Sequence, residues 1–232
     1  MTDETLHDPM WSYYQNKAQS VFDGSHARLD YLLRTVGRLV KTPRPVLLNI
    51  GIGDGHLERT AHEHGWLVHA LDPSPESVAA LVSSGIAAQT GRIEAMPFAD
   101  GQFDCVVASE VFEHLTDSQR ARGLQEIRRV LKPGGYLVGT VPYREVLEDN
   151  LAICPKCQQV FHRWGHTTSF DLAKMHGELA PHFGHIKCRR TAFVQFAGRS
   201  MGGKIKSLAR LVLAKCGASI AVPNMFFTAR KS

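Results

Sequence analysis

Three glycines and one carboxylate at fixed spacing are the residues that most clearly could do chemistry. The run Val46–Gly55 (VLLNIGIGDG) passes from apolar residues directly into Gly51, Gly53 and Gly55. A buried strand that ends in a glycine-spaced turn before a helix lets the backbone approach a nucleotide-like ligand closely. Asp72 follows 17 residues after Gly55, close to the spacing at which a carboxylate accepts hydrogen bonds from ribose hydroxyls. The pattern predicts a nucleotide-like ligand at the carboxyl end of the first strand.

A regular alternation of strands and helices must position these residues. Short apolar runs bounded by Gly or Pro predict strands, and apolar residues at helical spacing predict helices. The expected strands are Val46–Ile50, Leu67–Asp72, Ala87–Gln89, Phe103–Ser109, Tyr136–Val141, Ile186–Phe196 and Phe226–Arg230. The expected helices are Ala27–Val40, 55–64, 75–84, 120–131 and Asp171–Leu179. We therefore predict an α/β fold with a doubly wound, mostly parallel sheet and helices on both faces.

Four ordered segments resemble the class I S-adenosylmethionine (SAM)-dependent methyltransferases. They are the glycine turn with Asp72, GRIEAMPF at 91–98, FDCVVASEVFEHL at 103–115 and LKPGGYLVGTV at 131–141. The similarity is greatest to the methyltransferase type 11 subgroup, which carries a GDAExLPF segment, an EHL turn and an LKPGG turn. It runs from about Pro45 to Val141. It implies a Rossmann-like seven-stranded sheet whose last strand is inserted antiparallel, and SAM as the cofactor.

The resemblance also assigns cofactor-binding residues. The glycines would approach the amino acid head and the ribose, Asp72 would take the ribose hydroxyls, and the backbone N–H of Ile93 would meet adenine. Ser109 and Glu110 would border the methionine portion, and the N-terminal helices would form a lid. The expected residues are Asn49, Gly51, Gly53, Gly55, Asp72, Pro73, Arg92, Ile93, Ser109, Glu110 and Tyr14.

Two residues depart from the family pattern. The family commonly has an acid at the end of the first strand, where this chain has Asn49, and an acid that meets adenine, where this chain has Arg92. An amide lacks the charge that attracts an ammonium group, and arginine cannot accept a hydrogen bond. Asp54 could partly compensate. These departures leave a non-catalytic binding module as an alternative to an enzyme.

A histidine in the turn after the fourth predicted strand is the candidate base. In the family, the acceptor pocket lies beside His114, and the ordinary pKa of histidine suits proton removal from a hydroxyl at neutral pH. Glu113 is a weaker candidate that could instead orient His114. A purely structural role for His114 stays open.

Two cysteines and two histidines form a possible metal site in the segment Tyr143–Phe170. Cys154, Cys157, His162 and His166 have the spacing C-x2-C-x4-H-x3-H, and two thiolates with two imidazoles can surround Zn²⁺. We predict structural zinc. A redox pair, a role for the histidines in the acceptor site, and Cys188 as a fourth ligand are the alternatives. The segment also resembles an insertion of bacterial glycan and sugar O-methyltransferases.

Charge and composition bound the remaining possibilities. The 232 residues are 44% hydrophobic with a net charge of +5, and residues 187–232 hold ten Lys or Arg and no acid. The segment 199–217 has apolar residues on one helical face and basic residues elsewhere, so it could lie on an anionic membrane surface; an ordinary packed helix is the alternative. With no apolar leader or membrane span in the sequence, we expect a cytoplasmic protein with thiols rather than disulfides.

These observations predict one methyltransferase domain with four parts. They are a helical lid (1–44), a SAM-binding core (45–142), the Cys/His insertion (143–170) and a C-terminal part on the acceptor side (171–232). O-methylation of a sugar hydroxyl in a glycan, or in a related and possibly lipid-linked small molecule, is the expected reaction. A zinc-containing RNA methyltransferase is the alternative, because the chain is basic. A nicotinamide-dependent oxidoreductase would need GxGxxG instead.

Overall fold

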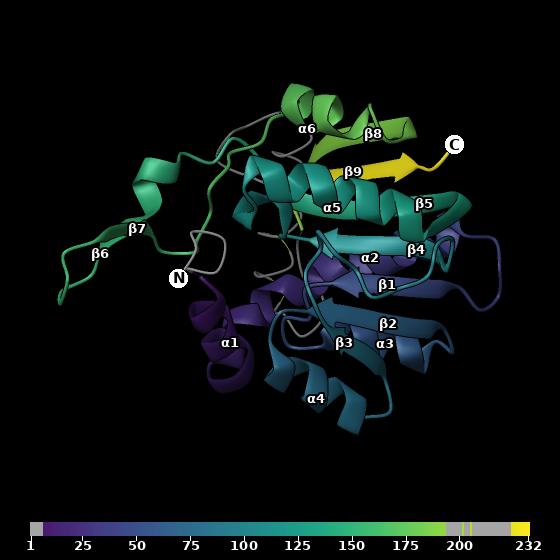
Figure 1. Cartoon of the computed structure of the whole chain (residues 1–232), viewed down its shortest axis with the longest axis horizontal. Helices are drawn as coiled ribbons and strands as arrows, with labels where there is room; N and C mark the ends of the chain where they lie inside the picture. Colours follow the sequence, from purple (N-terminus) through teal and green to yellow (C-terminus); the bar gives the residue numbers. More distant parts are fainter. Residues whose placement is uncertain (1–6, 194–200, 202–204, 206–223) are drawn as a thin grey trace.

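A seven-stranded sheet forms the centre of the computed structural model, which describes residues 7–193, 201, 205 and 224–232 (Figure 1). The strand order is β3-β2-β1-β4-β5-β9-β8. The strands are β1 (Val46–Ile50), β2 (Leu67–Asp72), β3 (Ala87–Thr90), β4 (Phe103–Ser109), β5 (Leu131–Pro142), β8 (Gly184–Thr191) and β9 (Asn224–Arg230). The first five pair in parallel, and β9 is antiparallel to both β5 and β8. The predicted fold class, including the inserted last strand, is confirmed.

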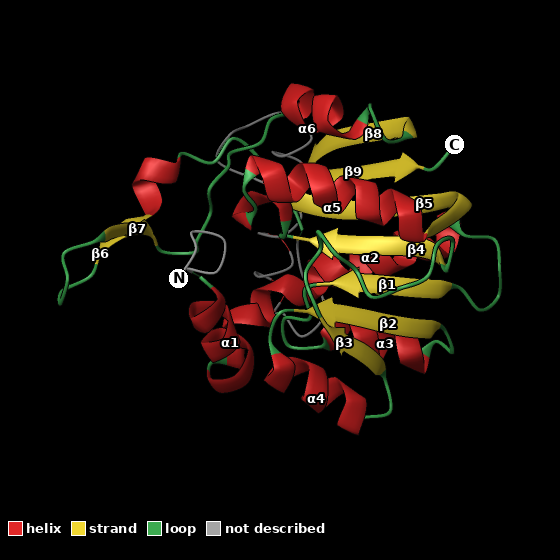
Figure 2. Cartoon of the chain, in the orientation of Figure 1, coloured by secondary structure: helices red, strands yellow, loops and turns green. Residues whose placement is uncertain are grey.

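Two apolar layers enclose this sheet between helices (Figure 2). On one face, α5 (Asp117–Val130) and α6 (Leu172–Leu179) pack through residues such as Ile127 and Met175. On the other face, α2 (His26–Leu39), α3 (His56–Glu63) and α4 (Pro75–Ser83) pack through Val36, Leu57 and Leu81. The interior strands β1 and β4 are buried on both sides, which explains their nearly continuous apolar sequences.

Some strand ends differ from those expected. β5 begins at Leu131, five residues before the predicted start at Tyr136, because Leu131 pairs with Phe103 ahead of an irregularity in the β4–β5 register. β8 begins at Gly184 rather than Ile186. The end of that predicted strand, after residue 193, and nearly all of the predicted amphipathic helix at 199–217 lie outside the described residues.

Two further segments lie beside the carboxyl ends of the parallel strands. Before the sheet come α1 (Asp8–Lys17) and the 3-10 helix η2 (Gln19–Ser25). After β5, the chain forms η4 (Leu147–Asn150) and a separate hairpin of β6 (Leu151–Ile153) and β7 (Val160–His162), which projects from the body of the molecule (Figure 1). In the described part of the chain, no helix has the length and apolar character needed to cross a membrane.

Candidate cofactor and acceptor site

A cavity of about 800 Å³ opens at the carboxyl ends of β1, β2 and β4. Its walls come from α1, η2, the glycine turn, the turn after β4 and the end of the insertion. Ten predicted site residues line it: Asn49, Gly51, Gly53, Asp72, Pro73, Arg92, Ser109, Glu110, His114 and His166. The insertion also contributes Trp164 and Thr167. This is where an open α/β sheet binds its ligand.

The glycine turn has the conformation that the sequence requires. Gly51, Gly53 and Gly55 have φ values of 83°, 60° and 78°, which side-chain-bearing residues rarely adopt. A Cβ at Gly51 would lie 3.3 Å from Val111 Cγ2, and one at Gly53 would lie 3.5 Å from the Phe22 ring. The backbone can therefore reach the cavity surface at Gly51 and Gly53. Gly55 directly precedes α3 and does not line the cavity.

Asp72 is the best-supported ligand residue of the cavity. Its side chain is buried at the end of β2, where Oδ1 accepts from Ser74 N at 2.8 Å. Oδ2 accepts from Ile52 N and from Gln15 Nε2, both at 2.8 Å. Burial raises the pKa of this carboxyl above its ordinary value, and the three donors act in the opposite direction. The donors fix its orientation toward the cavity.

A buried acid of α3 lies beside the end of β1, which the sequence did not reveal. Asn49 Nδ2 donates to Glu58 Oε1 at 2.7 Å and to Gly51 O at 2.9 Å. Glu58 comes from the first turn of α3 and is fully buried, so desolvation raises its pKa to about 7. A carboxyl group is therefore present at the end of β1, but it belongs to Glu58 and is hydrogen-bonded to the side chain of Asn49. Asp54, the residue expected to compensate, also lines the cavity, where its Oδ2 lies 2.6 Å from His26 Nε2.

The other predicted cofactor residues lie around the cavity. Arg92 forms an ion pair with Asp8 of α1, and Ser109 Oγ accepts from Arg28 Nε at 3.0 Å. Glu110 has a φ of 55°, unusual for a residue with a side chain, and its carboxylate accepts from Asn224 at 3.2 Å.

Three of the predicted cofactor residues, Gly55, Ile93 and Tyr14, do not line the cavity. The side chain of Ile93 is buried in the core, and Tyr14 lies behind the wall against Trp11 and Trp164. In the structure, Tyr14 thus packs against two aromatic residues of the cavity wall and does not face the cavity itself.

Two histidines close the far end of the cavity. The rings of His114 and His166 lie 4.7 Å apart at 73°, and Trp11 packs edge-on against His114 at 5.0 Å. Burial and the neighbouring histidines lower the pKa of His114 to about 3. The imidazole is therefore neutral at physiological pH and only weakly basic, which does not favour the predicted role as general base.

Behind His166 lies a glutamate of the insertion. His166 Nδ1 is 2.5 Å from Glu145 Oε2, and the stacked ring of His162 lies 4.7 Å from that of His166. His162 Nδ1 accepts backbone N–H groups from His166 at 3.0 Å and Trp164 at 3.3 Å. The insertion thus presents one histidine to the cavity, supported by a second histidine and a carboxylate that sequence reasoning missed.

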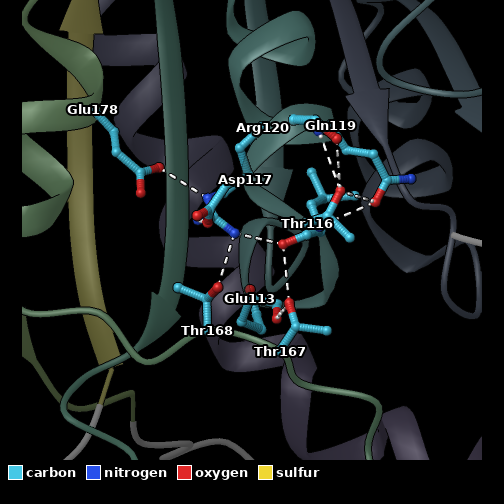
Figure 3. Close-up of polar contacts among 10 residues, drawn as sticks. Glu113, Thr116, Asp117, Gln119, Arg120, Thr167, Thr168 and Glu178 are labelled. Carbon is cyan, nitrogen blue, oxygen red and sulfur yellow. Dashed lines mark hydrogen bonds and ion pairs between the residues drawn. The ribbon is translucent and has the colours of Figure 1, made fainter. Parts of the chain in front are cut away.

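A buried arginine fixes the insertion against the turn after β4 (Figure 3). Arg120 of α5 donates to Thr168 Oγ1 at 2.9 Å and to Glu178 Oε2 at 3.0 Å, and it also bonds Leu115 O and Asp117. Beside it, Thr167 N donates to the backbone oxygen of Glu113 at 2.7 Å. These contacts hold His166 beside His114 although 52 positions separate them in the chain.

The four predicted zinc ligands do not come together among the described residues. His162 and His166 cluster with Glu145, whereas no such group contains a cysteine. Cys154 and Cys157 lie in the loop that joins β6 to β7, whereas His162 pairs with Leu151 at the base of the hairpin. Donors from Cys157 and Lys156 lower the pKa of the Cys154 thiol. The two cysteines and the two histidines therefore form two separate pairs among the described residues, not one tetrahedral set of metal ligands.

Comparisons with known proteins agree with this geometry. Residues 48–139 match the model of the methyltransferase domain family. The chain is 34% identical over 111 residues to an uncharacterized methyltransferase of Mycobacterium bovis, covering 47% of this chain and 42% of the relative. It is 32% identical over 136 residues to a ubiquinone biosynthesis O-methyltransferase of Methylobacterium nodulans, covering 53% of each. The matches span only about half the length of these curated relatives.

Solved structures resemble the whole fold at low sequence identity. A chain of a complex containing the Haloferax volcanii Trm112 methyltransferase activator has a TM-score of 0.67 at 17% identity, covering 95% of this chain and 97% of that one. The 1,6-didemethyltoxoflavin-N1-methyltransferase of Burkholderia thailandensis, solved with S-adenosylhomocysteine, has a TM-score of 0.65 at 17% identity, covering 98% and 87%. Residues 48–139 thus match a methyltransferase domain, and the fold of the chain is shared with these solved structures.

Proposed function

We propose that this protein transfers a methyl group from SAM to a hydroxyl group of a small molecule or glycan. The observation that carries the proposal is that one cavity joins two different sites. At one end, Asp72 and the glycine turn provide what a ribose and an amino acid head need. At the other end, His114 and His166 offer polar groups for an acceptor.

The residues at the cofactor end fit SAM. Asp72 would accept from the ribose hydroxyls, and Glu110 and Asn49 would lie near the charged amino acid head. SAM supplies an electrophilic methyl group on a sulfonium, whose sulfur leaves as a neutral thioether. Because the leaving group is neutral, the protein mainly has to align the acceptor atom and exclude water.

The acceptor end favours a hydroxylated molecule. Trp11 and Trp164 supply flat apolar surfaces in the wall, and Thr167 and the two histidines supply polar groups beside them. Aromatic planes beside hydrogen-bonding groups suit a sugar ring, which has apolar faces and hydroxyl edges. We therefore retain a sugar hydroxyl as the proposed acceptor. His114 would contact this acceptor, and Glu113 lies buried beside it.

Two experiments test this proposal. Titration calorimetry should show one SAM bound per chain, and Asp72→Asn should weaken that binding. Transfer of labelled methyl groups from SAM to a panel of free sugars, nucleotide sugars and RNA should then favour the sugars. No SAM binding would indicate the non-catalytic binding module, and transfer to RNA alone would support the nucleic-acid alternative.

A further inference from the structure

Three buried polar atoms beside the acceptor end of the cavity lack hydrogen-bond partners. They are Oε1 and Oε2 of Glu113 and Nδ1 of His114. Only 1% of Glu113 is exposed, so water does not solvate its carboxyl group. A buried polar group without a partner costs about 1–3 kcal/mol, and these atoms lie together rather than scattered. Clustered buried polar atoms without partners are typical of a site that binds a ligand.

His166 completes this group. One oxygen of Glu113 and one ring nitrogen each of His114 and His166 all lie within 4.8 Å of one another. A first-row metal bound at about 2.0–2.2 Å needs its ligand atoms roughly 3–4 Å apart. Small side-chain rotations therefore suffice to close the set around an ion, and His114 and His166 both line the cavity.

The surrounding hydrogen bonds have the pattern that supports metal-binding histidines. Such histidines donate their second ring N–H to a carboxylate or a backbone carbonyl, which fixes the tautomer. Glu145 Oε2 contacts His166 Nδ1 at 2.5 Å, which leaves Nε2 of His166 for a ligand. The backbone of Gly165 makes a hydrogen bond with His114.

A second group, Glu145 with His162 and His166, is a weaker candidate. His162 Nδ1 accepts two backbone N–H groups, so the ring proton of the neutral imidazole lies on Nε2. That nitrogen faces Glu145 Oε1 at 3.6 Å. A protonated nitrogen cannot bind a metal, and Glu145 is already engaged by His166. This group therefore supports the first one instead of binding an ion.

We propose that Glu113, His114 and His166 bind a first-row divalent cation at the acceptor end of the cavity, with Glu145 as a positioning residue. Two imidazoles and one carboxylate suit Zn²⁺, Fe²⁺ or a similar ion, and they leave coordination positions open. This assignment replaces the predicted cysteine-containing zinc site with a different set of ligands.

The role of the cation rests on the proposed function, whereas its binding does not. An ion in an open site can hold a hydroxyl oxygen of the acceptor and lower the pKa of that hydroxyl. An acceptor with two adjacent hydroxyls would gain most, because it can occupy two open positions.

Cobalt substitution tests the site directly. Co²⁺ is titrated into the metal-free full-length protein while visible absorption is recorded. We expect one tightly bound Co²⁺ per chain and no thiolate-to-cobalt charge-transfer band. Glu113→Gln and His166→Gln should each weaken binding by at least about tenfold, and Glu145→Gln by about 10- to 100-fold. The exposed His176→Gln and the double variant Cys154→Ser/Cys157→Ser should bind Co²⁺ like the wild type.

Several outcomes would overturn the proposal. Absence of tight Co²⁺ binding would remove the site, and a thiolate band that disappears in the cysteine variant would assign the ion to Cys154 and Cys157. Wild-type affinity in both Glu113→Gln and His166→Gln would also refute it. SAM titration of each variant shows that it is folded. Co²⁺ binding without methyl transfer would refute the proposed function while leaving the metal site standing.

Discussion

Replacing Glu58 by Gln should stabilise the protein at alkaline pH and have much less effect in acid. Glu58 is buried against Asn49, and its Oε2 and Asn49 Oδ1 both lack hydrogen-bond partners. Burial raises its pKa from 4.5 to about 7. Glutamine keeps an acceptor for Asn49 Nδ2, supplies the missing donors and carries no charge.

The sign follows from proton binding. Between pH 4.5 and 7 the folded state holds a proton on Glu58 that the unfolded state has released, so stability falls as pH rises through this window. The shift corresponds to about 3 kcal/mol lost at pH 8 and about 1 kcal/mol at pH 5. The free energy of unfolding of Glu58→Gln should therefore exceed that of the wild type by an amount that grows by about 2 kcal/mol between these pH values.

Urea unfolding at pH 5 and pH 8, followed by circular dichroism, measures this difference. Glu63→Gln is the matched control, since Glu63 lies on the same helix but is exposed. Its effect on unfolding should be equal at both pH values. A Glu58→Gln variant that is destabilised equally at pH 5 and pH 8 would refute the reasoning, because it would show that Glu58 is ionised at little cost in the folded state.

Three further substitutions test the site and its support. Asp72→Asn should weaken SAM binding about 10- to 100-fold by calorimetry, since hydrogen bonds to a charged group contribute about 1.5–3 kcal/mol; unchanged affinity would remove Asp72 from the site. Gly139→Ala should cost about 3 kcal/mol or more in urea unfolding, because its Cβ would lie 2.3 Å from Ala108 O. The open helical position Gly177→Ala is its control and should stabilise by up to about 1 kcal/mol. Arg120→Met should cost about 3 kcal/mol while Arg38→Met, at an exposed position of α2, costs little, and equal losses would show that the buried contacts of Arg120 contribute nothing specific.

Sequence patterns predicted the parts of this protein that depend on local order. The strands around the glycine turn were predictable because a buried parallel strand must be apolar on both faces, as β1 is with Leu47 on one face and Leu48 on the other. Asp72 was predictable because its position follows from a short, regular connection. The start of β5 was not, because it depends on pairing with Phe103 rather than on its own residues.

Long-range packing determined what the sequence could not show. By its type, Glu58 looks like an ordinary exposed residue of an amphipathic helix, yet it faces Asn49. Its position three residues before the buried Ala61 was the available indication that it lies on the buried face of α3. The spacing of Cys154 and His166 suggested one metal site, but a hairpin of paired strands keeps the cysteines away from the histidines. Only the folded chain brings Glu145 to His166.

The hydrogen bond from Gln15 of α1 to Asp72 limits the number of hydrogen bonds that the Asp72 carboxylate can accept from a bound cofactor. Two carboxylate oxygens offer about four lone-pair positions, and Gln15, Ile52 and Ser74 occupy three of them. A ribose presents two hydroxyls, so only one can be accommodated while all three donors remain. The donors from Ile52 and Ser74 are backbone groups of the turns that follow β1 and β2, so they are held in place by the fold. Gln15 is therefore the donor that must leave when both ribose hydroxyls bind Asp72. Binding of the nucleoside thus competes with the contact between α1 and Asp72. The helix that covers the cofactor occupies part of the cofactor's own binding site when the cofactor is absent.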